Sequence, residues 1–495
     1  MLYARICREI RILFIKEVNS VIKWIKKGVY KLNEMINKPE EKSPNNLNYL
    51  EYIVKTFKSS KERKRQEIGV NYYKGKHDIL NKKKEVIGRN GELEEVKNIP
   101  CNKRIDNQYA IAVDKKVNYL LGRAPTLRYN EENIDSFLQD IITPRFNRNL
   151  KNILRDSYNC GIGFMYVYID DESNLVTKRL NPLECKAIWK DEEHQELEFL
   201  VRMYNSIEFT NGAEIEVGYA EVYESDKMTL YKIVGESTLI KIKDNYYIID
   251  SENNTYSWGC VPIIAFKYNQ DEIALIEKVK NLQDALNEML SNFNDNMEEH
   301  PRNSIMVIHN YDGQDLGEFR KNLNTYGAVK VRNDGGVSSL TVDVNSQNYI
   351  SIISLLKNAI IENAKSFDAK DDRLGANPNM MNIQSMYSDI DIDSNGVETE
   401  YKSAFHKLDK FIKIYLQSRF KVQISKESNL DIIFNKDVLI NESQVISDIR
   451  NSTGILSMET LIENHPYIDD VKKEIDRIEK EKTKEDIDAY GDRNG

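Results

Sequence analysis

The sequence lacks the residue patterns that mark catalytic and metal-binding proteins. Its five cysteines lie far apart and form no Cys-x-x-Cys pair, so neither a zinc site nor a disulfide framework is indicated. Its six histidines include no His-Glu-x-x-His motif, and the chain contains neither a Walker sequence nor a nucleophile elbow. We therefore predict that the chain is not an enzyme and that it uses no metal or cofactor.

Positive charge is too scarce for a protein that holds duplex DNA tightly. The formal net charge is −9, whereas tight binding of phosphates requires clustered Lys and Arg side chains. The chain has 495 residues, of which 40% are hydrophobic and 30% are charged, so it can bury a large core. These values predict a soluble protein with two or more folding modules.

The first part of the chain has the pattern of a basic amphipathic helix. Apolar residues recur at helical spacing from Ile10 to Leu32, and arginines and lysines fill the positions between them. The charges interrupt the apolar residues too often for a transmembrane helix, and no small-residue cleavage site follows. We expect a packing or partner helix here, with binding to a membrane surface as the alternative.

Two long helices with a small insert between them form the clearest pattern in the chain. The apolar residues of the first helix are Ile276, Val279, Leu282, Leu286, Met289, Phe293 and Met297. A second row, offset by about half a turn, forms an acidic stripe of Glu277, Asn281, Asp284, Glu288, Asp295 and Glu299. Pro301 ends this helix, and helical spacing returns from Asn348 to about Phe367. The insert has short β segments at 305–308, 327–331 and 337–344, with turn signals such as 333–336 between them.

The region from about Tyr49 to Tyr268 mixes both kinds of spacing and predicts an α+β domain. Helical spacing occurs at 111–121 and 137–158, and alternating residues predict strands at 164–169, 199–204 and 221–223. Gly161 and Gly163 lie between a helix and a strand, but no Lys-Ser or Lys-Thr follows them. We expect a tight turn there rather than a phosphate loop.

The segment 368–382 is polar and rich in Asn, with Gly and Pro, which predicts a loop between helices. Residues 391–396 match the first half of a calcium loop, but Lys402 occupies the twelfth position, where Glu normally supplies a bidentate ligand. We expect an acidic turn at the start of the next helix instead. Beyond about Lys421 the patterns predict a strand at 431–434, helices at 445–449 and 458–462, and a charged helix at 469–488.

Several segments resemble the portal proteins of tailed bacteriophages, especially siphophages of Gram-positive bacteria, and they occur in the order of that family. They are residues 72–79, 102–125, 258–287, 431–437 and 454–461. The resemblance implies an α+β portal fold with an α/β wing, a two-helix stem, a small β-rich clip, a long wing helix and a helical crown. The implied parts are an N-terminal extension and linker (1–45), wing (46–270), first stem helix (271–300), clip (301–345), second stem helix (346–367), tunnel loop (368–382), long wing helix (383–420), crown (421–488) and disordered tail (489–495).

The same resemblance implies a function. The family usually forms a dodecameric ring at one capsid vertex, conducts DNA during packaging and ejection, and nucleates procapsid assembly. The implied partners are further copies of the chain, the major capsid protein and scaffold, the terminase large subunit, a head completion or adaptor protein at the clip, and double-stranded DNA in the channel. The chain would be located in the virion, and in the host cytoplasm during assembly.

Two sets of residues would then face the DNA. Carboxylates of the first stem helix, repeated around a channel, would repel phosphates; they are Glu277, Asp284, Glu288, Asp295 and Glu299. The tunnel loop would contribute Lys370, Arg373, Asn377, Pro378, Asn379, Met380, Met381 and Asn382, with the two cations making transient phosphate contacts. A solvated helix face and an ordinary exposed connection are the respective alternatives.

Two other classes of function compete with the portal interpretation. A packaging ATPase or other nucleic-acid enzyme is disfavoured by the missing phosphate loop. A membrane-associated or cellular scaffold that uses the basic N-terminal helix remains as the second alternative. The scaffold interpretation predicts liposome binding by residues 1–34 and no ring.

Overall fold

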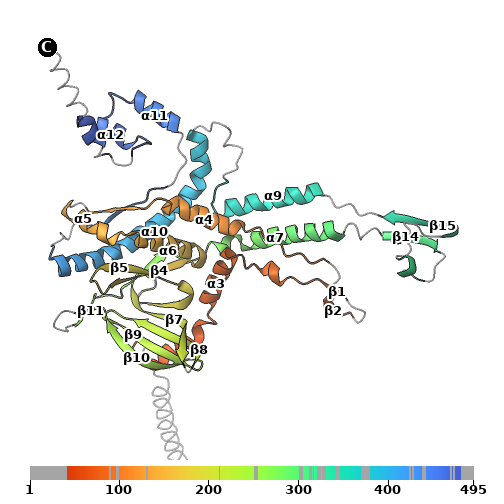
Figure 1. Ribbon diagram of the computed structural model, residues 1–495, viewed down its shortest axis with the longest axis horizontal. Helices are drawn as coiled ribbons and strands as arrows, with labels where there is room; N and C mark the ends of the chain where they lie inside the picture. The colour runs from red at the N-terminus through yellow and green to blue at the C-terminus, as the bar shows by residue number, and fades with distance from the viewer. Residues whose placement is uncertain are drawn as a thin grey trace, which may run out of the picture. The chain divides into compact units, whose positions relative to one another are not determined.

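The computed structural model describes most of the chain in two compact units (Figure 1). The described residues are 42–87, 91–95, 100–129, 132–210, 212–249, 255–299, 305–311, 331–340, 346–368, 380–422, 428–436, 442–468 and 474–480, with a few single residues between them. The helix predicted over 10–32 and the tail 489–495 lie outside them. Among the described residues, no helix has the length and apolar character that crossing a membrane requires. The first unit contains 42–60 and 186–261, and the second contains the described parts of 61–185 and 262–495.

The first unit is a five-stranded sheet covered by one helix. The strand order is β10-β9-β8-β7-β6. The strands are β6 (Cys185–Trp189), β7 (Leu197–Thr210), β8 (Ala213–Tyr223), β9 (Lys227–Val234) and β10 (Thr238–Tyr246), followed by the short pair β11 (Ile248–Ile249) and β12 (Thr255–Tyr256). The helix is α2 (Leu47–Phe57), and Asn46 caps it because its Oδ1 accepts a hydrogen bond from the Tyr49 amide at 3.3 Å. β7 and β8 extend beyond the predicted segments 199–204 and 221–223 because they pair with each other as far as Thr210 and Ala213.

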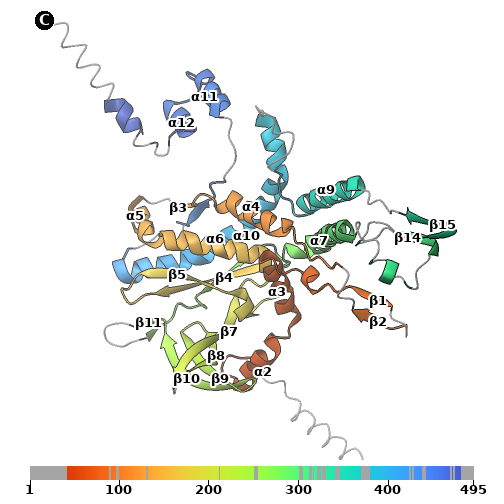
Figure 2. The same cartoon turned by 45° about the vertical axis from the view of Figure 1, so that its right-hand side comes forward.

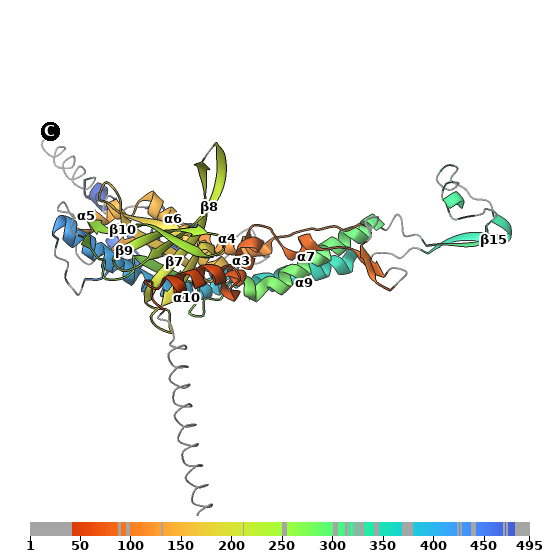
Figure 3. The ribbon, with the colours of Figure 1, turned by 90° about the horizontal axis from the view of Figure 1, so that it is seen from below.

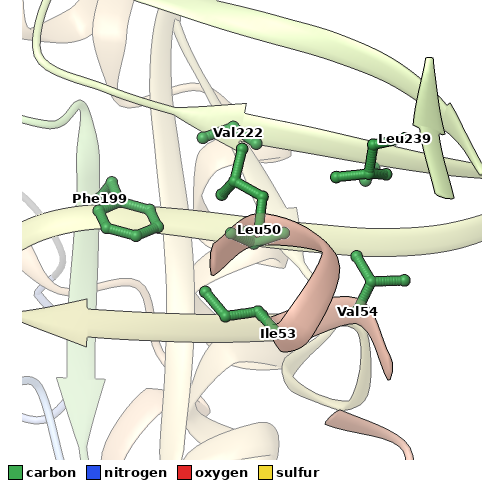
Figure 4. Close-up of a cluster of buried hydrophobic side chains, with 8 residues drawn as sticks. Leu50, Ile53, Val54, Phe199, Val222 and Leu239 are labelled. Carbon is green, nitrogen blue, oxygen red and sulfur yellow. The ribbon is translucent and has the colours of Figure 1, made fainter. Parts of the chain in front are cut away.

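The core of the first unit lies between α2 and the sheet (Figure 4). The apolar side of α2 consists of Leu50, Ile53 and Val54. It packs on one face of the sheet, which is made by Phe199 and Val201 of β7, Ala220 and Val222 of β8, and Leu239 of β10. Every second residue of a strand points to the same face, so this spacing places one apolar face under the helix. The buried residues of α2 recur three and four positions apart, which gives the helix a matching apolar face.

The second unit is built on a three-stranded sheet with the order β13-β4-β5. β4 (Ile162–Ile169) pairs antiparallel with β5 (Leu175–Leu180) on one side and with β13 (Ile263–Lys267) on the other. Two helices, α6 (Pro144–Cys160) and α10 (Met380–Phe420), pack on this sheet (Figure 2). Phe266 of β13 lies against Tyr401 and Phe405 of α10, with ring centroids 4.9 and 5.7 Å apart. Ser157 of α6 joins the layers because its hydroxyl donates to the Phe266 carbonyl at 2.8 Å.

The helix predicted over 137–158 is in fact two helices. α5 (Glu132–Ile141) ends before Thr143, and α6 begins at Pro144. Thr143 is the N-cap of α6, since its hydroxyl accepts a hydrogen bond from the Phe146 amide at 3.3 Å. Pro144 takes the first helical position, where an N–H group has no intrahelical partner. The apolar spacing continues across this break, so periodicity alone predicts one helix.

The remaining described elements complete the second unit. α3 (Lys61–Tyr73) and α4 (Gln108–Leu121) pack with α6, while α7 (Ile276–Glu299) and α9 (Ser346–Asn363) run side by side (Figures 1 and 3). The short elements are η1 (Asp78–Asn81), η2 (Pro182–Glu184), the pair β1 (Glu85–Ile87) and β2 (Leu93–Glu95), and the pair β3 (Thr126–Arg128) and β16 (Asp431–Ile433). α11 (Glu442–Asn451) and α12 (Met458–Glu463) come last, as predicted. Of the charged helix predicted at 469–488, residues 474–480 are described and helical.

In the described residues of the insert between α7 and α9, β14 (Ile305–Tyr311) pairs antiparallel with β15 (Val331–Leu340). Residues 333–336, which the sequence predicts to be a turn, lie inside β15. The pairing changes from His309 opposite Gly336 to Tyr311 opposite Val331, so these residues form a bulge. Asn310 and Asp334 have φ angles of +50° and +61°, a conformation that Asn and Asp tolerate. The segments predicted at 327–330 and 341–344 lie outside the described residues.

The helix α10 corrects two predictions. It begins at Met380, inside the predicted loop 368–382, and it continues through 391–396, where an acidic turn was expected. The carboxylates of this stretch bind other helices: the Tyr119 hydroxyl donates to Asp391 at 2.6 Å, and Lys116 Nζ donates to Asp393 at 2.7 Å. Because these carboxylates accept hydrogen bonds from other helices, they do not compete for the backbone N–H groups of α10. The observed architecture is α+β, which confirms the predicted fold class.

Candidate functional site

The carboxylates predicted to face a channel lie on α7, which forms a packed pair with α9. Phe293 of α7 and Tyr349 of α9 have ring centroids 5.2 Å apart, and Asn296 Nδ2 donates to the Tyr349 hydroxyl at 2.8 Å. Val279 and Leu286 on the apolar face of α7 are fully buried. The apolar stripe predicted for this helix is therefore a packing face.

A row of buried polar side chains follows α7 next to the apolar face. Gln283, Asn287, Ser291 and Asp295 are each 2% exposed or less. Their oxygens accept hydrogen bonds from the backbone amides of Tyr109, Asp106, Arg104 and Asn102, at 3.0, 3.1, 2.9 and 2.6 Å respectively. The non-helical segment 101–107 and the first turn of α4 are thus bound to α7 through side chains, and each of these four backbone donors has an acceptor.

The spacing of this row explains how a helix can bind an irregular segment along its length. Residues four apart on an α-helix are separated by about 6.0 Å, and alternate residues of an extended chain by about 6.6 Å. The amides of residues 102, 104 and 106 can therefore lie opposite the side chains of residues 295, 291 and 287, respectively. A row of i, i+4 residues also drifts around the helix by about 40° per step, because the helix has 3.6 residues per turn. The row consequently starts beside the apolar face and reaches the acidic stripe at Asp295.

Two carboxylates of the predicted channel-facing stripe are bound within the chain, one of them beneath the segment 101–107. Asp295 is only 2% exposed, and besides Asn102 it has Lys84 and Lys82 nearby, at 3.7 and 3.9 Å. Asp284 is half-buried and accepts hydrogen bonds from the Tyr72 hydroxyl at 2.6 Å and from Lys280 at 2.7 Å. The prediction was wrong for Asp295, because the segment 101–107 covers it. Asp284 accepts the hydrogen bond that joins α3 to α7.

Glu277 and Glu288, by contrast, are exposed to solvent. They are the exposed carboxylates among the described side chains of the predicted acidic stripe, and Asn281 of the same stripe is exposed as well. Glu299 is the last residue of α7, and its side chain lies outside the described part.

His77 completes the contacts between α7 and α3. Its ring is 2% exposed and stacks on Tyr72, with centroids 4.4 Å apart. One ring nitrogen, Nε2, lies 3.0 Å from the Tyr72 carbonyl, and Nδ1 lies 2.7 Å from Asn287 Nδ2. Burial lowers the pKa of His77, so the neutral ring donates from Nε2 and accepts at Nδ1.

Two lysines of α4 hold the end of α9. Lys115 Nζ donates to the Phe367 carbonyl at 2.6 Å, and Lys116 Nζ donates to the Lys365 carbonyl at 3.0 Å. Both carbonyls lie just beyond Asn363, the last residue of α9, so the two lysines fix the chain where it leaves this helix. Lys116 also forms a buried ion pair with Asp393 of α10, and burial, only partly offset by this carboxylate, lowers the pKa of Lys116 to about 8.

The start of α10 is held by the same helix. Tyr119 of α4 stacks on Tyr387, with centroids 5.6 Å apart, and donates its hydroxyl to Asp391. Phe367 packs against Tyr387 from the end of α9, with centroids 4.7 Å apart. α4 therefore fixes both elements between which the predicted tunnel loop runs. We call these contacts of Lys115, Lys116 and Tyr119 the α4 clamp.

The residues predicted for the tunnel loop itself fall mostly outside the described part of the chain. Lys370, Arg373, Asn377, Pro378 and Asn379 are among the residues that are not described. Met380, Met381 and Asn382 belong to the first turn of α10, and the Met381 side chain is 77% exposed. No contact of these residues with DNA is tested by the structure.

The two remaining motifs are resolved as structural features. Gly161 is the left-handed C-cap of α6, with φ +82°, and a Cβ there would lie 1.9 Å from the Glu272 carbonyl oxygen. The tight turn that we predicted is therefore made at Gly161, and Gly163 already belongs to β4. Asp393, from the incomplete calcium motif, binds Lys116 instead. Within the described ranges, no group of three or more His, Cys, Asp or Glu residues is placed to hold a metal ion.

Sequence comparison decides the family of this chain. The family described as "Phage portal protein, SPP1 Gp6-like" matches residues 45–488. The chain belongs to the phage portal protein family. This match confirms the resemblance that the sequence motifs indicate, and it covers both units of the fold.

Two portal proteins have similar sequences along most of their length. The portal protein of Bacillus phage SPP1 is 24% identical over 429 residues, which is 83% of this chain and 82% of that protein. The portal protein of Clostridium phage phiCD119 is 24% identical over 438 residues, which is 85% of this chain and 93% of that protein. Among solved structures, a chain of the virion of the native gene transfer agent particle covers 71% of this portal chain and 87% of its own length, with 10% identity and a TM-score of 0.38.

Two parts of the site in this portal chain escaped sequence reasoning. The buried polar row of α7 did have a signal, since Gln283, Asn287, Ser291 and Asp295 recur at strict four-residue spacing and include no Lys, Arg or Glu. A solvated face would normally be richer in those long charged residues. The α4 clamp had no such signal, because its partners lie about 250 to 277 residues away in the sequence.

Proposed function

We propose that this portal chain assembles into a dodecameric ring at one vertex of a capsid. DNA passes through the ring during packaging and ejection, and the ring nucleates procapsid assembly. The observation that carries this proposal is the family match over residues 45–488. The role is structural, and the chain contributes geometry and charge rather than bond chemistry.

The exposed residues of the α7–α9 pair support a channel lining that does not hold DNA. Glu277 and Glu288 would repel phosphates when repeated around a ring. The exposed residues of α9 include the uncharged polar side chains of Gln347, Ser351, Ser354 and Asn358, beside the apolar Ile350, Ile352 and Leu355. A duplex that meets carboxylates, amides and hydroxyls without clustered cations can slide, because tight binding depends on ion pairs with phosphates.

The α4 clamp supports the role of the segment 368–382 as a tunnel loop. Lys115, Lys116 and Tyr119 hold the chain on both sides of that segment, so a force on the loop would reach the packed part of the second unit. In this proposal Lys370 and Arg373 make transient phosphate contacts, and Asn377, Pro378, Asn379, Met380, Met381 and Asn382 line the narrowest part of the channel.

The proposed partners follow from the same role. The insert with β14 and β15 is the clip, which would bind the terminase large subunit during packaging and a head completion or adaptor protein afterwards. The ring would also contact the major capsid protein and scaffold. Its location is the capsid vertex of the virion, and the host cytoplasm during assembly.

Native mass spectrometry and negative-stain microscopy of the full-length chain test the ring. We expect closed rings with a central hole, close to dodecameric in mass. A compact dimer without a channel would contradict the proposal.

A further inference from the structure

The outer part of the β7–β8 pair projects from the sheet of the first unit as a two-stranded ribbon (Figure 3). β8 pairs with β9 only from Gly218 to Tyr223, whereas its pairing with β7 continues to Ala213. Residues 205–210 and 213–217 therefore lie beyond the third strand, and we call them the β7–β8 tip. Two-stranded ribbons are marginally stable in water, so a ribbon of this kind gains stability from a surface that covers it.

The β7–β8 tip continues the apolar face that α2 covers further along the sheet. Phe199 and Val201 of β7 lie under α2, and Ile207 and Phe209 follow on the same face because side chains alternate along a strand. Ile207 and Phe209 are nevertheless 69% and 76% exposed. The apolar face of β7 thus continues beyond the part that α2 covers. On the opposite face of the tip, Ile215 is 47% exposed as well.

The same tip carries only negative charge. It contains Glu208, Glu214 and Glu216, and neither Lys nor Arg occurs between Arg202 and Lys227. Glu208 forms an ion pair with Lys232 at 3.4 Å, while the side chains of Glu214 and Glu216 are exposed. A surface that fits the tip would therefore be apolar and basic.

The edge of the same sheet formed by β10 carries both apolar and basic side chains. β10 is the outermost strand, and its Ile240 and Ile242 are 54% and 49% exposed. Lys241 and Lys243 flank Ile242 in the sequence and are exposed too, and Lys241 also forms an ion pair with Asp244 at 2.8 Å. A bulge between Lys241 and Lys243 distorts the pairing of this edge with β9, which favours contacts through side chains over the addition of another strand.

We propose that the β7–β8 tip of one copy docks on the β10 edge of a second copy. Ile207 and Phe209 would cover Ile240 and Ile242, and the glutamates of the tip would meet Lys241 and Lys243. The partner is a second copy because both complementary surfaces belong to this chain. Two different patches on each subunit make a head-to-tail contact, which closes into a ring when the rotation between copies fits. The inference rests on the proposed function and identifies one contact that holds the ring.

Charge reversal tests this contact in the full-length chain. Variant one is Glu214→Lys/Glu216→Lys, and variant two is Lys241→Glu/Lys243→Glu. Each variant alone would place like charges on the tip and the edge, so each should remain monomeric. In an equimolar mixture, the tip of either variant matches the edge of the other, and alternating rings should form. Native mass spectrometry would show assemblies that contain both variants in equal number.

The matched control is Glu192→Lys/Glu193→Lys, which reverses two exposed charges elsewhere in the same unit. This control should form rings as the unchanged chain does, and circular dichroism should show that all variants are folded. Rings from either single variant would overturn the tip contact while leaving the proposed ring intact. Failure of the mixture to assemble would also overturn it. A parent chain that never assembles would contradict both the ring and the contact.

Discussion

At the scale of single residues, the α4 clamp depends on one buried ion pair. The side chain of Lys116 is completely buried and that of Asp393 is 6% exposed, and their atoms lie 2.7 Å apart. The Tyr268 hydroxyl donates to the other Asp393 oxygen at 2.8 Å. Removing one partner of such a pair leaves an uncompensated buried charge, whereas neutralising both partners does not.

Lys116→Met should therefore lower the free energy of unfolding by about 3–5 kcal/mol. The double variant Lys116→Met/Asp393→Asn should recover a large part of this loss, because the Asn keeps an acceptor for Tyr268 without a charge. Chemical denaturation measures both values, and Lys115→Met on the half-buried neighbour is the control. Equal stability of the single and double variants would contradict the interpretation.

A pH dependence follows from His77. Its pKa in the folded chain is below the ordinary value of 6.5, chiefly because burial disfavours the charged ring, with Asp284 and Asp78 opposing the shift in part. The unfolded chain thus binds more protons below about pH 6.5, and stability is lost as the pH falls through that range. Between pH 7 and 5, the free energy of unfolding should fall more steeply for the parent chain than for His77→Gln. Parallel curves would count against a buried neutral His77.

At the scale of elements, the polar row of α7 is the feature that binds the segment 101–107. Asn287 joins three partners, since its Oδ1 accepts from the Asp106 amide and from Gln283 Nε2, and its Nδ2 donates to His77. A buried group that loses its partner costs about 1–3 kcal/mol, much more than a typical surface change.

Asn287→Ala should consequently lower the free energy of unfolding by roughly 2–3 kcal/mol, because both Asp106 and His77 lose a partner. Amide hydrogen exchange at Asp106 should also become faster. Asn281→Ala, on the exposed side of the same helix, should change stability by less than about 0.5 kcal/mol. Similar effects of the two substitutions would show that the row does not bind the segment.

The elements differ in how far the sequence predicts them. α7, α9 and β4 were predicted because their apolar residues have clear helical or alternating spacing. The break before α6 was missed because apolar spacing crosses it, although Thr143-Pro144 is a recognisable helix start. The start of α10 and its course through 391–396 were missed because acidic residues there are satisfied by Tyr119 and Lys116, which are distant in sequence.

The acidic stripe shows the same limit at the site. Periodicity placed Glu277, Asp284, Glu288 and Asp295 on one face of α7, but it could not show that the segment 101–107 crosses that face at Asp295. Which face of a helix is free depends on the chain that packs against it. Glu277 and Glu288 are therefore the exposed carboxylates among the described side chains of the stripe.

At the scale of the whole molecule, the charge of the proposed channel should control whether DNA is retained. Glu277→Lys/Glu288→Lys would replace repeated carboxylates by ammonium groups, and each phosphate contact releases counterions. Purified rings of this variant should retain duplex DNA in a mobility-shift assay, and the retention should weaken steeply with salt. Rings of the parent chain and of Glu192→Lys/Glu193→Lys should not retain it. DNA retention by the control variant would indicate binding outside the channel.

The central claim is that this portal chain forms a ring around a channel to which the exposed residues of α7 contribute. Electron cryomicroscopy of the assembled full-length chain tests it most directly. The account predicts a closed ring whose open axial channel is lined in part by Glu277 and Glu288, with Asp295 still covered by the segment 101–107. An assembly without an axial channel, or a channel from which Glu277 and Glu288 point away, would contradict it.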